Sequence, residues 1–178
     1  FLTTGGMLPD MNFYLMRHGI AVPQDNSGIS SDEERPLSSK GIKRMRTAAK
    51  GLMTLEIPFD RIFTSPLLRA RQTAEIIAEV LDMEGHLEEL RELAPGGSAE
   101  RLLSSLAAHR EKKRLLLVGH QPLLGETASF LLLAKDMGIE ISLKKGGLCR
   151  IESDDLPPEG GSRLHWILTP RQLRLLAG

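Results

Sequence analysis

The stretch Leu15-Met16-Arg17-His18-Gly19 sets an arginine and a histidine side by side where an apolar run ends and a glycine begins a turn. Residues 12–16 have the composition of a short buried strand, which would deliver both side chains to one edge of a sheet. A nitrogen nucleophile beside a guanidinium suits chemistry on a phosphoryl group, because phosphorus needs an in-line attacking atom and cations around its equatorial oxygens. An Arg-His-Gly tripeptide recurs by chance in many chains, so other segments must supply the remaining groups of a phosphoryl site.

Strands and helices alternate along the rest of the sequence. Residues 115–118 are all apolar, as in a strand that is buried on both faces, whereas residues 87–93 fit no single pattern. The predicted strands are 12–16, 61–64, 115–118, 148–152 and 163–168, and the predicted helices begin near Ser38, Ser65, Ser98, Pro122 and Pro170. This order predicts an α/β fold of three layers, α/β/α, with a mostly parallel sheet and helices on both faces.

The composition limits the kinds of partner. The 178 residues include 23 basic and 23 acidic side chains, so the formal net charge is zero and we expect no nucleic-acid or acidic-membrane partner. No apolar run approaches the ~20 residues needed to cross a bilayer, and the single Cys149 fits a reducing cytoplasm. We predict a cytoplasmic protein with one domain at 11–178, preceded by a tail or cloning remnant at 1–10.

Two later segments add cations at the same edge of the predicted sheet. Ser65-Pro66 has the form of a helix start, with a hydroxyl N-cap and a proline at the first helical position. Arg69 then lies in the first turn, where free backbone amides and the helix dipole favour an anion. His120 follows the strand at 115–118, where it either stabilises transition-state charge or satisfies a local carbonyl. Ligands of such sheets bind beyond the carboxyl ends of the strands, so these segments point to one crevice.

Two further expectations concern the chain between the first two strands. Residues 20–37 are polar and without periodicity, which is typical of either a functional lid or a disordered connection. The helix that begins near Ser38 is expected to bury an apolar stripe made of Ile42, Met45, Ala49, Leu52 and Met53.

These motifs resemble those of the histidine phosphatase superfamily, which includes the phosphoglycerate mutases. Residues 15–21 are similar to its Arg-His-Gly signature, and Pro36-Leu37-Ser38-Ser39-Lys40-Gly41 is similar to the helix start that follows. Residues 65–74 resemble its second arginine motif, and Val118-Gly119-His120 matches the segment of its second histidine. The small size and Gly119-His120-Gln121-Pro122 look most like bacterial phosphohistidine phosphatases of the SixA type.

The resemblance implies a phosphoglycerate mutase-like fold and a phosphatase that works through a covalent phospho-His18 intermediate. Arg17, Arg69 and His120 would form the phosphate pocket, with no metal and no organic cofactor. Larger members of the superfamily use a glutamate after a leucine as proton donor, and Glu92 is the nearest match in this sequence.

Three functions remain open on the sequence. The preferred substrate is phosphohistidine on a signalling or phosphotransfer protein. The first alternative is a phosphatase acting on a small phosphate ester, which needs an acid such as Glu92 to protonate the leaving alkoxide. The second alternative is a non-catalytic module that binds phosphate or a phosphoprotein, although binding alone does not need a nucleophile such as His18.

Overall fold

The computed structural model describes residues 11–25, 28–134, 138–154 and 156–178. The predicted tail at 1–10 lies outside these residues. Within them, six strands form one sheet in the order β3-β2-β4-β1-β5-β6. Their bounds are β1 (Met11–Arg17), β2 (Arg61–Thr64), β3 (Leu87–Glu89), β4 (Arg114–Gly119), β5 (Leu148–Ser153) and β6 (Arg163–Leu168).

The sheet is mostly parallel, as predicted. The first four strands of this order run in one direction, with β1 paired to β4 and β2 paired to both β4 and β3. Strands β5 and β6 are antiparallel to their neighbours, which the short loop between them permits. The ambiguous segment at 87–93 divides into the edge strand β3 and a short 3-10 helix, Arg91–Leu93.

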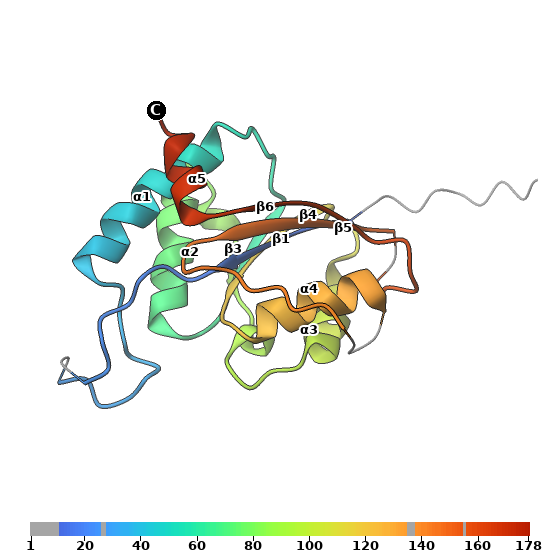
Figure 1. The fold of residues 1–178 in the computed structure, drawn as a ribbon, viewed down its shortest axis with the longest axis horizontal. Helices are drawn as coiled ribbons and strands as arrows, with labels where there is room; N and C mark the ends of the chain where they lie inside the picture. The colour runs from blue at the N-terminus through green and yellow to red at the C-terminus, as the bar shows by residue number, and fades with distance from the viewer. Residues whose placement is uncertain (1–10, 26–27, 135–137, 155) are drawn as a thin grey trace, which may run out of the picture.

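Helices cover both faces of the sheet (Figure 1). Those on one face are α1 (Ser39–Met53), α2 (Leu68–Leu81) and α5 (Pro170–Leu175), and those on the other are α3 (Ala99–Leu106) and α4 (Leu123–Leu133). Strand β4 contributes to both cores, because Leu116 and Val118 pack beneath the first group while Leu115 and Leu117 pack beneath the second. The three-layer prediction is therefore confirmed. None of the described helices is long and apolar enough to span a membrane.

Helix α1 begins as predicted, and it buries three of the five residues of the predicted stripe, Met45, Ala49 and Leu52. The Ser38 hydroxyl caps the helix by accepting a hydrogen bond from the Gly41 amide at 3.0 Å. Ile42 and Met53, which were expected in the core, are 37% and 52% exposed. The buried face of α1 also includes Gly41 and Gly51, where the helix approaches other backbone closely. A Cβ on Gly51 would meet the Leu173 carbonyl of α5.

The predicted start of α2, with Pro66 as the first helical residue, was wrong by two residues. The helix begins at Leu68, and no side chain caps it. Ser65 instead continues the β2–β4 ladder, because its amide donates to the Val118 carbonyl at 3.0 Å. Its hydroxyl accepts from the Leu67 amide at 3.3 Å, just before the helix begins.

Candidate active site

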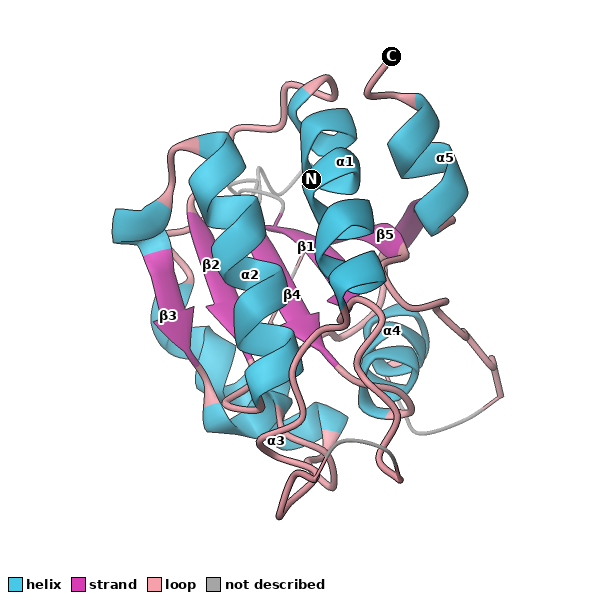
Figure 2. Ribbon diagram, turned by 90° about the vertical axis from the view of Figure 1, so that its left-hand side faces the viewer, coloured by secondary structure: helices cyan, strands magenta, loops and turns pink. Residues whose placement is uncertain are grey.

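The carboxyl ends of the parallel strands lie at one edge of the sheet, and the connecting loops gather beyond it (Figure 2). Arg17 is the last residue of β1 and pairs in register with Gly119 at the end of β4. The His18 amide donates to the Gly119 carbonyl at 3.0 Å, which holds the two strand ends together. The imidazole rings of His18 and His120 consequently lie 5.0 Å apart between centroids.

Arg69 joins these histidines from the first turn of α2. Its Nε donates to His18 Nε2 at 3.3 Å, and the residue is 4% exposed. Arg17, at the end of β1, donates from Nη1 to the Leu143 carbonyl at 2.9 Å. Burial lowers the pKa of both guanidiniums, which nevertheless remain cationic in any protein. The structure therefore brings together three of the side chains that the sequence singled out, His18, Arg69 and His120. The fourth, Arg17, is near enough for its cation to add to the effect of burial and lower the pKa of both histidines.

The surroundings of His18 determine which nitrogen carries the proton. Its Nδ1 lies 2.7 Å from the Gly19 carbonyl, which only accepts, so Nδ1 is the protonated nitrogen and Nε2 keeps its lone pair. Burial lowers the pKa of His18 to about 3, and the nearby His120 and the cations of Arg69 and Arg17 contribute, against the opposing effect of the Gly19 carbonyl. The imidazole is thus neutral at pH 7, and its Nε2 faces a guanidinium.

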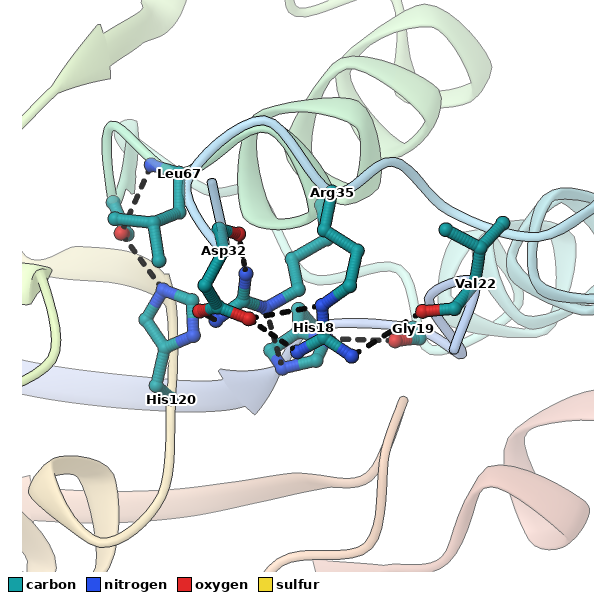
Figure 3. Close-up of polar contacts among 9 residues, drawn as sticks. His18, Gly19, Val22, Asp32, Arg35, Leu67 and His120 are labelled. Atoms are coloured by element: carbon teal, nitrogen blue, oxygen red, sulfur yellow. Dashed lines mark hydrogen bonds and ion pairs between the residues drawn. The ribbon is translucent and has the colours of Figure 1, made fainter. Parts of the chain in front are cut away.

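His120 occupies a similar environment. Burial lowers its pKa to about 4, followed by the effect of the Arg69 cation. Its Nε2 forms a hydrogen bond with the Ser65 hydroxyl at 2.8 Å (Figure 3). The other ring nitrogen, Nδ1, is buried without a partner among the described residues, and so is Arg17 Nε. Each buried polar atom without a partner lowers the stability of the fold by about 1–3 kcal/mol. An anionic ligand that accepted hydrogen bonds from such nitrogens would remove this cost.

Asp32 is a residue of this site that sequence reasoning missed. Its carboxylate accepts from Arg69 Nη2 and Arg35 Nε, both at 2.9 Å, and its backbone carbonyl accepts from Arg69 Nη1 at 2.7 Å (Figure 3). Partial burial raises the pKa of this carboxyl, but the Arg69 and Arg35 cations together outweigh it and hold the pKa below its usual range. The sequence shows only an acidic run, Asp32-Glu33-Glu34, and nothing in it distinguishes the first of the three.

The connection at 20–37 is tied to α2 in its described part. The Leu68 amide donates to the Glu33 carbonyl at 2.9 Å, and the Leu37 amide donates to the Gln72 side chain at 2.7 Å. An isolated bridge also pairs Ala21 with Leu37. These contacts favour the functional interpretation of this segment, while its closure over a ligand stays a prediction.

Ser65 and Thr73 are further contributors that the sequence did not identify. Thr73 Oγ1 accepts from the Gly19 amide at 3.0 Å and donates to the Arg69 carbonyl at 2.7 Å. This buried hydroxyl therefore fixes the turn after His18 to the helix that carries Arg69. Both residues lie within the arginine motif at 65–74, but a motif does not reveal which partner each hydroxyl takes.

Glu92 forms no hydrogen bond or ion pair with the other candidate site residues. It lies in the 3-10 helix after β3, half-buried, and its carboxylate forms no hydrogen bond or ion pair within the described part of the chain. Its acid role stays a prediction. Among the described residues there is also no group of three or more histidine, cysteine or acidic side chains placed to hold a metal ion.

Comparison with known proteins identifies the family. The model of the histidine phosphatase superfamily (branch 1) matches residues 13–101. The chain belongs to this superfamily. This confirms the resemblance that the Arg17-His18-Gly19 and 65–74 motifs carry.

Several known proteins are similar to this one over most of its length. An uncharacterized protein of Picosynechococcus is 41% identical over 145 residues, covering 80% of this chain and 86% of that protein. The phosphohistidine phosphatase SixA of Escherichia coli is 28% identical over 167 residues, covering 93% and 98%. A solved structure of the protein histidine phosphatase SixA complexed with tungstate superposes with a TM-score of 0.80 at 27% identity, covering 92% and 99%. The chain is therefore similar to the SixA type in both sequence and fold.

Proposed function

We propose that this histidine phosphatase hydrolyses phosphohistidine on a signalling or phosphotransfer protein, through a covalent phospho-His18 intermediate, in the cytoplasm. We also propose that residues 11–178 act as one domain, with Arg17, Arg69 and His120 as the phosphate-binding residues. The observation that carries the proposal is the state of His18: a buried, neutral imidazole whose Nε2 faces Arg69 and lies beside His120. The similarity to SixA supports the choice of substrate.

In the first step, His18 Nε2 attacks phosphorus while the bond between phosphorus and the substrate imidazole breaks. The substrate ring takes a proton from solvent on its other nitrogen before cleavage, so it leaves with the bonding pair as neutral imidazole. Phosphorylation makes the His18 ring cationic, and the Gly19 carbonyl, which accepts from Nδ1 at 2.7 Å, stabilises that charge. The guanidiniums of Arg17 and Arg69 neutralise the equatorial oxygens, and buried cations do so more effectively than solvated ones.

In the second step, water attacks the phosphoryl group and His18 leaves as the neutral imidazole. One water is consumed, and inorganic phosphate and the free substrate histidine are the products. A neutral His18 is needed at the start of every cycle, and its pKa of about 3 provides this across the physiological range.

The leaving group explains the preference for phosphohistidine over phosphate esters. Imidazole is readily protonated before its bond to phosphorus breaks, so it needs little help from an enzymic acid. An alkoxide needs that help, at ~1.4 kcal/mol for each factor of ten in rate. The Glu92 carboxylate forms no hydrogen bond or ion pair with the other described site residues, which fits a substrate that does not need this acid.

The test is turnover of a phosphohistidine peptide beside phosphoserine and simple alkyl phosphates. We expect the peptide to be preferred, and rapid quenching to trap an acid-labile, base-stable phosphoryl label on His18. His18→Ala should abolish turnover and label, whereas His86→Ala, a substitution at an exposed histidine outside the site, should preserve both.

Two results would replace the proposal. Faster turnover of alkyl phosphates, together with its loss in Glu92→Gln, would establish a small-ester phosphatase. Tight phosphate binding with no turnover of any substrate would leave only a binding module.

A further inference from the structure

A basic cleft of about 210 Å³ lies beside the candidate active site. It is bounded by the first turns of α1 and α5, which lie side by side in Figure 2, and by the turn before β5. Its basic lining residues come from three separate segments of the chain: Arg44, Lys144, Lys145, Arg171 and Arg174. We refer to these five residues as the basic cleft.

The basic cleft is fixed to the catalytic strand by the backbone. Gly19 and Ile20, the residues that follow His18, form part of its wall. The Gly146 amide at the end of the lysine turn donates to the carbonyls of Arg17 and His18, at 2.9 and 3.1 Å. A ligand in the cleft would therefore lie next to whatever occupies the phosphoryl site.

The cations of the basic cleft are not neutralised by the rest of the described chain. None of the five forms an ion pair there, and no carboxylate lines the cleft. Other exposed arginines do find partners, such as Arg46 with Glu79 and Arg163 with Glu152. The whole chain has a formal net charge of zero, so the rest of the chain carries five more negative than positive charges. The five cations of the basic cleft are therefore a local concentration of positive charge.

We propose that the basic cleft binds an acidic segment of the phosphoprotein whose phosphohistidine enters the active site, an inference that rests on the proposed function. Arg174 is half-buried and the other four cations are exposed. Exposed cations hold a single small anion weakly, but several of them together steer and orient a partner that carries several carboxylates. The volume is also below the ~300–1,000 Å³ of a typical small-molecule pocket.

The test uses two phosphohistidine peptides that differ only in a block of five residues, all glutamate or all glutamine. The block is placed at several distances on either side of the phosphohistidine. At low salt the wild type should show kcat/KM about tenfold higher for the best glutamate peptide. Above ~0.5 M salt this difference should disappear, because exposed charges are then screened.

Charge-reversal variants locate the effect. Lys145→Glu with Arg171→Glu should remove the preference for glutamate while free phosphohistidine is turned over at the wild-type rate. Lys50→Glu with Arg101→Glu, which changes the charge equally at exposed positions outside the cleft, should keep the preference. If the reversed cleft variant fails to fold by circular dichroism, Lys145→Ala with Arg171→Ala replaces it.

Binding separates failure of this inference from failure of the proposed function. Fluorescence anisotropy with the unphosphorylated peptides should show tighter binding of the glutamate form, lost in the cleft variant, even if phosphohistidine proves not to be the substrate. Equal binding and turnover of the two peptides by the wild type would overturn the inference. An equal loss of glutamate preference in the control variant would also overturn it. So would displacement of the labelled glutamate peptide by inorganic phosphate at a lower concentration than unlabelled glutamate peptide requires.

Discussion

The active site and the basic cleft both gather cations at the same edge of the sheet, but burial separates their roles. Arg69 is 4% exposed, and its donors are fixed by Asp32 and His18. Lys145 and Arg171 are exposed, without ion pairs in the described structure. A buried, oriented cation acts strongly on charge that develops in a transition state, whereas an exposed one is screened and mainly affects encounter. The burial of a cation therefore decides how much its identity and orientation matter here.

The largest expected effect tests this contrast with one chemical change at two places. Arg69→Lys keeps the charge but removes the planar fork, so kcat/KM for free phosphohistidine should fall roughly 100-fold. Arg171→Lys in the basic cleft should change it less than twofold, because an exposed cation needs no fixed geometry. Steady-state assays of both variants check this, and a loss of similar size at the two positions would break the comparison.

A smaller effect is expected on stability as pH falls. The pKa values of His18 and His120 are lowered to about 3 and about 4, so below pH 6.5 the unfolded chain binds more protons at these groups than the folded one. Their stabilising contribution is complete above pH 6.5 and is lost as pH falls toward the folded pKa values. Each histidine should lower the free energy of unfolding by up to about 1.4 kcal/mol per pH unit in that range.

Urea denaturation between pH 7 and pH 5 measures this dependence. His120→Asn should flatten it, since the buried imidazole is removed, while His86→Asn at an exposed position serves as the control. An unchanged slope in His120→Asn would show that the site histidines are not held neutral by burial.

The smallest expected effect concerns Asp32, which engages Arg69 within the site. Asp32→Asn removes a negative charge 2.9 Å from Arg69 Nη2, so inorganic phosphate should inhibit about three- to tenfold more strongly. Glu33→Gln, one residue along and without a side-chain contact to the site, should leave inhibition unchanged. Weaker phosphate inhibition in Asp32→Asn would show instead that the carboxylate orients Arg69 for the ligand.

The prediction from sequence was most successful where the signal is local. An apolar run followed by Arg17-His18, and another followed by His120, indicate where strands end, and parallel strands bring their ends to one edge. The start of α1 at Ser38 was likewise readable, because a cap and its partner lie three residues apart. The start of α2 was not, since the Ser65 amide bonds to Val118 of β4 and its hydroxyl bonds to His120 and to the Leu67 amide, so the helix begins only after Leu67.

By itself the sequence determined the three-layer fold and the three elements that supply the candidate site, β1, β4 and α2. The periodicity of apolar residues and the positions where strands end are properties of neighbouring residues, so they can be read locally. Only the tertiary structure decided which acidic residue meets Arg69, 37 positions away, and which face of α1 is buried. It also assembled the basic cleft from segments near residues 44, 144 and 171, which no local pattern connects. Such pairings depend on how loops close in space, and that closure is determined by the packing of the whole core.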